Sequence, residues 1–203
     1  HSEKVFNMKR LLLILILTFS FQSWAVADDI RDFEIEGMSI GDSALDYYSK
    51  KELRKFDKTY YPKSKKFYLR EKISNKFQSY DGVQFAFKRK DNSYQIYGIN
   101  GYIFFETHFQ KCLNKMNEIE NELDNIFIKS TKTKNEGWKH PADTSGKSKQ
   151  WQIQYVLNND EGAVSLECIN WSDKITRNDG FTDNLNIAIY SKDYEKFVRY
   201  EAY

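Results

Sequence analysis

The sequence has few of the residues that most catalytic and metal sites require. It contains two cysteines, Cys112 and Cys168, and three histidines, of which His108 and His140 lie in the body of the chain. No Cys-x-x-Cys pair occurs, so a catalytic dithiol is not expected. A stable zinc site takes three or four protein ligands, and no further histidine or free cysteine lies near His140 and Asp143. We therefore expect neither a metal site nor a cofactor.

The sequence also lacks an excess of charge of one sign. Its formal net charge is +2, from 31 basic and 29 acidic residues. Removing residues 1–27 takes away three basic residues and one acidic residue, which leaves 28 of each. Nonspecific binding to nucleic acid depends on a basic surface, so no nucleic-acid partner is expected.

The longest apolar run, Leu11 to Phe21, is about half the ~20 residues that a membrane-spanning helix needs. Lys9 and Arg10 precede it, and Ala25-Val26-Ala27 follows with the spacing of a signal-peptidase site. The pattern predicts upstream residues and a cleaved secretory signal peptide over residues 1–27, with cleavage after Ala27. The protein would be periplasmic or secreted and would meet the membrane only transiently, through this signal peptide. An uncleaved membrane anchor is the alternative.

The predicted export favours a disulfide between the two cysteines, because an even number of cysteines in an exported chain is typical of disulfide bonding. Cys112 shares a helical stripe with other apolar residues, and Cys168 alternates with Val164 and Leu166 on one side of an expected strand. Both side chains would therefore point into a common core, and we predict a Cys112–Cys168 bond. Two separate buried thiols are the alternative.

The clearest element is a long amphipathic helix over residues 107–127. Its apolar residues recur at spacings of three and four, and they are Phe109, Cys112, Leu113, Met116, Ile119, Leu123, Ile126 and Phe127. Shorter helices are expected near Ser49 with Glu52, which form a capping box, and after Ser191. We expect the rest of the chain to pack against the long helix.

Alternating apolar residues predict two groups of three strands. The first group lies near residues 67–73, 83–87 and 94–105, where Gly98 and Gly101 suggest a bulge or a break. The second group lies near residues 151–157, 163–171 and 185–189. Residues 28–203 are thus predicted to form a single α+β domain, an antiparallel sheet packed against the long helix in the order α-βββ-α-βββ. One interpretation of this order is a duplicated αβββ unit.

The stretch Ile35 to Ser49, with the sequence IEGMSIGDSALDYYS, resembles the opening of a group of uncharacterised small exported bacterial proteins. The resemblance extends to the segment that starts at Cys112 and to residues 140–148. That group has no assigned activity, so the resemblance implies nothing about function.

Gly41-Asp42-Ser43 is similar to the nucleophile block of GDSL esterases, in which a serine attacks an ester. Those enzymes also need a histidine near the C-terminus and a Gly-x-Asn-Asp block for the oxyanion, and the sequence has neither. They are built on a parallel sheet, whereas these strands are joined by short polar turns. The sequence therefore favours helix capping by Asp42 or Ser43 over catalysis.

Residues 129–150 are polar and show no apolar period, so we expect a long loop there that is either mobile or functional. Long loops on a rigid scaffold commonly carry binding residues. The candidate binding surface comprises residues in or beside this loop and other loops, Trp138, His140, Asp143, Trp151 and Trp171. An ordinary rim of the core is the alternative for each of these aromatic residues.

These observations predict an exported, non-enzymatic binding or interaction protein of the cell envelope. Its partner would be an unidentified envelope protein or a small ligand. Two rival functions stay open. One is a periplasmic hydrolase whose site is assembled only by the fold, and the other is a small-molecule or glycan-binding protein with an aromatic-lined cleft.

Overall fold

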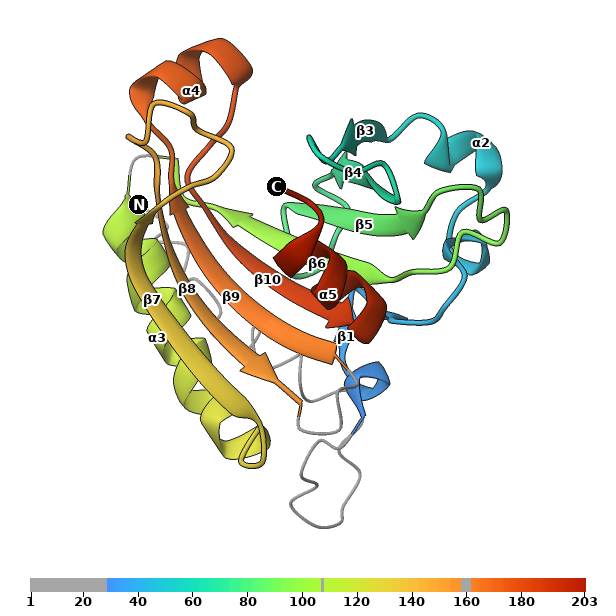
Figure 1. The fold of residues 1–203 in the computed structure, drawn as a ribbon, viewed down its shortest axis with the longest axis horizontal. Coiled ribbons are helices and arrows are strands. Elements are labelled where there is room, and N and C mark those ends of the chain that lie inside the picture. The colour runs from blue at the N-terminus through green and yellow to red at the C-terminus, as the bar shows by residue number, and fades with distance from the viewer. Residues whose placement is uncertain (1–28, 107, 158–161) are drawn as a thin grey trace, which may run out of the picture.

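The computed structural model describes residues 29–106, 108–157 and 162–203. The predicted signal peptide, its cleavage site and Thr107 lie outside these residues. The described chain forms one large antiparallel sheet with helices on both sides (Figure 1), which confirms the predicted α+β class. No helix in the described part of the chain is long and apolar enough to cross a membrane.

An N-terminal segment of short elements precedes the large sheet, and it comprises η1 (Ile30–Asp32), β1 (Glu34–Ile35), β2 (Met38–Ser39), η2 (Ala44–Asp46) and α2 (Lys50–Leu53). The first group of sheet strands is β3 (Asp57–Tyr60), β4 (Phe67–Ile73), β5 (Gly82–Lys88) and β6 (Gly98–Phe104). The long helix α3 (Phe109–Ile126) separates it from β7 (Thr131–Lys139), β8 (Lys149–Val156) and β9 (Gly162–Asn170). The chain continues with α4 (Asp173–Asp179), β10 (Asn184–Ser191) and α5 (Lys192–Tyr200).

The eight strands of the large sheet lie in the order β3-β4-β5-β6-β10-β9-β8-β7. Each half of the chain is therefore a four-stranded antiparallel meander, and the last strands of the two meanders, β6 and β10, pair at the centre. Three strands per half were predicted. The two that the sequence missed, β3 and β7, form the two edges of the sheet.

Both edge strands lack the apolar alternation that identifies a half-buried strand. All four residues of β3 are exposed, and β7 carries seven exposed residues among nine. The prediction of a long loop over residues 129–150 was therefore wrong for its first half, since Thr131–Lys139 pairs with β8 throughout most of its length. An edge strand needs no apolar side chains when its backbone is held by one neighbour.

One face of the sheet, which we call the apolar face, carries the main hydrophobic core. Its side chains alternate along the central strands, for example Val164, Leu166 and Cys168 on β9. Helix α3 lies over β9 and β10, and the N-terminal segment covers the first meander through residues such as Met38 and Leu53. The long helix therefore covers the second half of the sheet, where η1 also contacts β9 and β10, and residues 34–56 cover the first half.

The predicted disulfide is present and joins α3 to the sheet. Cys112 on α3 and Cys168 on β9 are both fully buried, and their Cα atoms are 5.9 Å apart. Because the bond links helix and sheet directly, it holds α3 in position on the apolar face.

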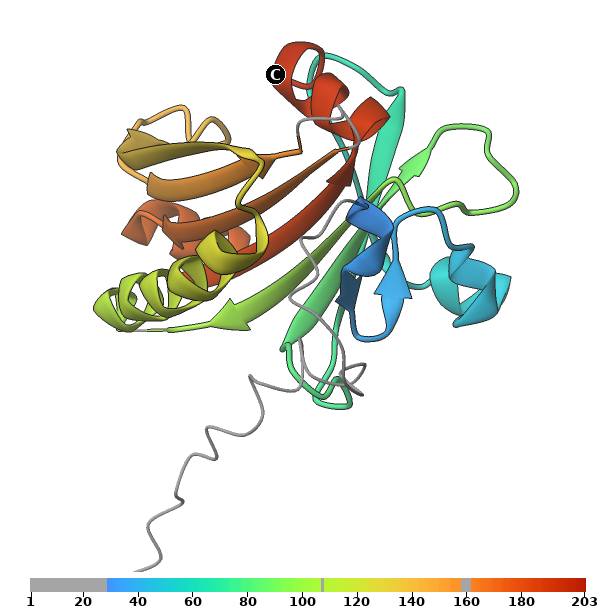
Figure 2. The same ribbon diagram turned by 90° about the horizontal axis from the view of Figure 1, so that it is seen from below.

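A second, smaller core lies on the opposite side of the sheet, where Figure 2 shows α5. Tyr194 and Phe197 of α5 pack there on Phe67, and the Tyr194 hydroxyl hydrogen-bonds with that of Tyr61. As predicted, Ser191 caps α5 by accepting a hydrogen bond from the Tyr194 backbone N–H at 3.4 Å.

Gly98 and Gly101 do not interrupt β6, contrary to the prediction of a bulge or break. A Cβ atom at Gly98 would lie 2.3 Å from the Tyr194 ring, and one at Gly101 would lie 2.4 Å from the Tyr80 ring. These distances are far below van der Waals contact. The two glycines therefore let an aromatic ring pack directly on the strand, one on each face of the sheet.

Candidate binding face

The side of the sheet that carries α5 has mostly polar side chains on its inner strands beyond α5, with Ile169 as an apolar exception. Successive residues of a strand point to opposite faces, so the neighbours of the buried apolar residues along each strand face this side. We call this set the polar face, and its members are Glu71, Gln84, Asn100, Tyr102, Gln152, Ser165, Glu167, Asn184 and Asn186.

Strand register arranges these side chains in rows across the sheet. Asn186 on β10 lies opposite Tyr102 on one side and Glu167 on the other, and Glu167 lies opposite Gln152. In the neighbouring row, Gln84 lies between Glu71 and Asn100. Directly opposite residues have side chains close enough to interact, so each row is a continuous strip of polar contacts.

Glu167 is the acceptor at the centre of this face. Its Oε1 atom accepts hydrogen bonds from Gln152 Nε2 at 2.8 Å and from Ser165 Oγ at 3.0 Å. Its Oε2 atom lies 3.5 Å from Asn186 Nδ2. Neutral amide and hydroxyl groups thus hold the carboxylate in place.

A second carboxylate, Glu71, lies on β4 and accepts a hydrogen bond from Gln84 Nε2 at 2.8 Å, while Gln84 Oε1 accepts one from Asn100 Nδ2 at 3.3 Å. Burial raises the pKa of Glu71 above its ordinary value of 4.5, the hydrogen bond from Gln84 partly offsets this rise, and the charge of Asp57 adds to it.

Tyr102 lies within electrostatic reach of both carboxylates. Burial raises the pKa of its phenol well above the ordinary value of 10.0, and the charges of Glu71 and Glu167 raise it further. The phenol is therefore neutral at physiological pH.

Two acceptors on this face have no donor among the described residues. Asn184 and Asn186 are 6% and 5% exposed, and the Oδ1 atom of each lacks a hydrogen-bond partner there. Arg70 Nε and Tyr80 OH are the other two such atoms, and both belong to the opposite side of the sheet. Leaving a buried polar atom unpaired costs about 1–3 kcal/mol, so two such oxygens on one face of one strand call for an explanation.

Aromatic residues adjoin the polar face at the end near α4, and we call them the aromatic end: Trp138, His140, Trp171 and Phe181. The His140 ring lies 4.4 Å from that of Trp171, which lies 4.8 Å from that of Phe181. Trp138 is 57% exposed. It lies opposite Gln150 of β8, so its side chain is on the same side of the sheet as the polar face. Burial lowers the pKa of His140 from 6.5 to about 4, and the charge of Asp143 only partly opposes this effect.

Asp143, a predicted binding residue, is instead buried inside the turn that links β7 to β8. Its carboxylate accepts hydrogen bonds from the backbone and hydroxyl of Ser148, from the Ser145 backbone and from the Ser172 hydroxyl. The serine hydrogen bonds lower the pKa of Asp143, so it is ionised at neutral pH. Its hydrogen bonds fasten the turn to the start of α4, which makes its role structural.

Trp151 does not join the other predicted surface residues. It points to the apolar face, where its ring lies 4.8 Å from that of Phe109 at the start of α3. Period-two alternation explains this position, because Trp151 shares a face with Ile153 and Tyr155. Of the five predicted binding residues, the structure therefore places His140 and Trp171 in contact, and Trp138 lies two residues before His140 on the side of the polar face.

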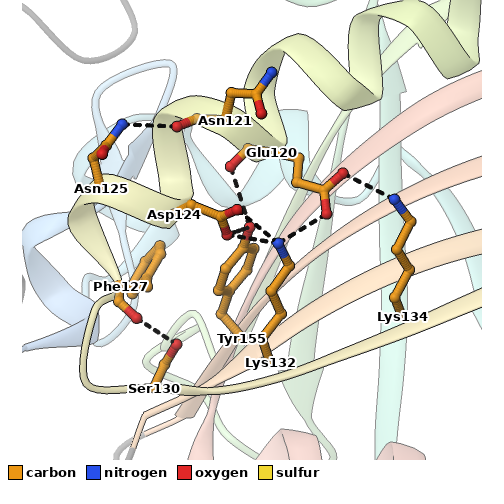
Figure 3. Close-up of polar contacts among 9 residues, drawn as sticks. All are labelled: Glu120, Asn121, Asp124, Asn125, Phe127, Ser130, Lys132, Lys134 and Tyr155. Carbon is orange, nitrogen blue, oxygen red and sulfur yellow. Dashed lines mark hydrogen bonds and ion pairs between the residues drawn. The ribbon is translucent and has the colours of Figure 1, made fainter.

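A separate polar network lies on the other side of the sheet (Figure 3). Lys132 of β7 contacts Asp124 at 2.6 Å and Glu120 at 2.8 Å, and Lys134 contacts Glu120 at 3.0 Å. The Tyr155 hydroxyl donates to Asp124 at 2.7 Å. Every charge in this network has a partner within it, so it serves to fasten edge strand β7 to α3.

The Gly-Asp-Ser block has the expected capping role. The Ser43 hydroxyl accepts from the Leu45 backbone N–H at 3.2 Å and donates to the Ser93 carbonyl at 2.6 Å, while Asp42 accepts from the Ser39 backbone at 2.9 Å. Among residues 29–106, 108–157 and 162–203, no group of three or more His, Cys, Asp or Glu residues is arranged to hold a metal ion.

Comparison of the chain with protein-family models, with curated proteins and with solved structures finds no match. The polar face and the aromatic end themselves are therefore the basis for a functional proposal.

Proposed function

We propose that this protein is an exported, non-enzymatic binding protein of the cell envelope, and that its ligand surface is the polar face together with the aromatic end. One observation carries the proposal. Asn184 and Asn186 hold buried acceptors that no described residue satisfies, and Asn186 lies directly opposite Glu167. A ligand that donates hydrogen bonds would satisfy these acceptors.

Export is supported by two independent features. The Cys112–Cys168 bond fits an oxidising compartment, because disulfides are rare in reducing cytosol. The basic and apolar pattern of residues 9–27 is typical of a leader. Both features agree with a periplasmic or secreted location.

Binding is favoured over catalysis because the predicted reactive groups are engaged elsewhere. Ser43 caps η2, and His140 is packed against Trp171 with its pKa lowered to about 4, which makes it a weak base. The polar face instead offers amides and carboxylates that are fixed by their own hydrogen bonds, as is usual in sites that recognise polar ligands.

A hydrolase is the second candidate, and a specific observation favours it. Glu71 has a raised pKa, and Tyr102 lies within reach of both Glu71 and Glu167. A carboxyl group with a raised pKa and a neutral phenol are both groups that can act as general acids.

The test is a thermal-shift screen of the oxidised protein against sugars, amino acids and amines, followed by a search for chemical change in each bound compound by mass spectrometry. A ligand of the polar face raises the melting temperature of the wild type but not that of Asn186→Leu. Unchanged compound supports binding, whereas conversion of the compound supports the hydrolase. Shifts of equal size in both proteins would contradict the proposed surface.

A further inference from the structure

The polar face carries negative charge that the protein does not neutralise. Within the described part of the chain, neither Glu71 nor Glu167 forms an ion pair. Arg199 of α5 reaches this side and donates to Gln154 Oε1 at 3.3 Å, but its charge is paired with Glu195. The face is thus electrostatically complementary to a cation.

The buried side-chain atoms left unpaired on this face are of one kind. The amide donors are used within the protein, since Gln152 and Asn186 face Glu167, and Asn184 Nδ2 donates to the Thr182 carbonyl at 2.8 Å. The buried atoms left unpaired there are both acceptors, the Oδ1 atoms of the two asparagines, and the carboxylate of Glu167 has further lone pairs. A ligand that suits this face therefore supplies hydrogen-bond donors and needs few donors from the protein.

An ammonium group meets this requirement better than a hydroxyl group. It carries three N–H donors and no acceptor, whereas each hydroxyl brings lone pairs that need donors from the site. The exposed rings of Trp138 and Phe181 add a surface for an alkyl chain or for a cation–π contact at the aromatic end.

Building on the proposed function, we propose that the polar face binds an aliphatic amine, with a primary ammonium group held by Glu167 and by the Oδ1 atoms of Asn184 and Asn186. Amines with an alkyl chain are the class that fits, because the exposed rings of Trp138 and Phe181 at the aromatic end offer a surface for that chain. The ammonium supplies the missing donors and neutralises the negative charge of Glu167.

The experiment is titration calorimetry of the oxidised protein with putrescine and spermidine, and with the uncharged four-carbon diol as the matched analogue of putrescine. We expect both amines to bind and the diol not to bind. Glu167→Gln keeps the size of the side chain and removes its charge, so it should weaken amine binding at least about tenfold, the loss typical of a charged hydrogen bond. Glu122→Gln, on an exposed position of α3, should leave binding unchanged.

Backbone chemical-shift changes in the wild type locate the ligand without any substitution, and we expect them at Glu167 and Asn186. Amine binding that Glu167→Gln leaves intact, or equal binding of the diol, would overturn the inference. If the diol or a sugar binds and Asn186→Leu abolishes that binding, the proposed ligand surface stands and the ammonium ligand is wrong. If every compound binds the wild type and Asn186→Leu equally, or if no compound binds either protein, the amine ligand and the proposed ligand surface are both wrong.

Discussion

Strand β9 shows the contrast between the two faces of the sheet most directly. Leu166 points to the apolar face and packs in the main core, whereas its neighbour Glu167 points to the polar face and is held by amides and a hydroxyl. Both lie in the interior of the same eight-stranded sheet. The apolar face gains stability from burial, while the polar face buries groups that cost stability unless they are paired.

This difference indicates that the apolar face supplies stability and that the polar face supplies the candidate binding groups. The apolar face holds the disulfide, the long helix and the N-terminal segment, and the polar face holds the two asparagine acceptors that no described residue satisfies. Substitutions on the apolar face should therefore lower stability, and those on the polar face should change binding with little loss of stability or with a gain. Four predictions test this division, from the largest effect to the smallest.

Removing the disulfide tests the apolar face at its strongest point. The bond spans 56 residues of sequence, and a loop of that length contributes about 4 kcal/mol to the free energy of unfolding. We expect Cys112→Ala with Cys168→Ala to lose about that amount in urea denaturation followed by tryptophan fluorescence. Reduced wild-type protein serves as the control and should lose a similar amount. A loss no larger than that of a surface substitution would show that α3 is held by packing alone.

The second prediction compares neighbouring residues on opposite faces. Leu166→Ala leaves a cavity in the main core and should lower the free energy of unfolding by about 3 kcal/mol. Glu167→Gln keeps its shape and should cost less than about 1 kcal/mol. Both values come from the same urea titration. Equal losses would show that the two faces contribute alike to stability.

Asn186→Leu replaces an amide whose oxygen has no partner in the described chain with an apolar side chain of similar size. It should raise the free energy of unfolding by about 1 kcal/mol while abolishing ligand binding. Asn121→Leu, on an exposed position of α3, is the matched control and should change stability by about 0.5 kcal/mol or less. A large loss at Asn186 would mean that its amide stabilises the fold.

The smallest expected effects are the changes in the free energy of unfolding caused by carboxylate substitutions. These changes should depend on pH, and at neutral pH they should have opposite signs on the two faces. Because burial raises the pKa of Glu71 above 4.5, its ionised form disfavours folding, and Glu71→Gln should gain stability at neutral pH and match the wild type in acid. Burial also tends to raise the pKa of Asp124, but hydrogen bonds from Lys132 and Tyr155 outweigh it and lower the pKa below 3.8. Asp124 therefore stabilises the fold at neutral pH, and Asp124→Asn should lose that contribution.

The Asp124 effect should disappear as the pH falls through its lowered pKa. Each difference should stay below about 1 kcal/mol, because Glu71 is only partly buried and Asp124 is exposed, so that solvent screens both charges. The measurement is the urea midpoint of each variant and of the wild type at neutral and at strongly acidic pH. Effects of the same sign at neutral pH would contradict the division between the faces.

Much of the fold was predictable because it follows apolar periodicity. The long helix, the inner strands of the sheet and the disulfide all rest on the alternation or the helical spacing of buried residues, as Cys112 and Leu166 illustrate. The edge strands β3 and β7 gave no such signal, since their side chains are exposed and a single neighbour holds their backbone. Helix α4 was missed for a similar reason, because none of its residues is buried.

The candidate site was largely hidden from sequence reasoning. Asn184 and Asn186 alternate with Leu185 and Ile187, a pattern that normally places the polar side chains in solvent. That they are buried follows from the central place of β10 in the sheet, which only the pairing with β6 and β9 reveals. Trp138 lies on the side of the sheet that carries the polar face, whereas strand alternation places Trp151 on the other face.

The pairing of β6 with β10 also constrains when the molecule can fold. β10 is the last strand of the large sheet along the chain, yet it lies at the centre of that sheet and joins the two meanders. During synthesis β6 therefore lacks its second neighbour until almost all of the described chain has emerged, and long-range strand pairing of this kind is slow. A chain whose central strand pair cannot form until its last strand has emerged therefore stays open while it is being made.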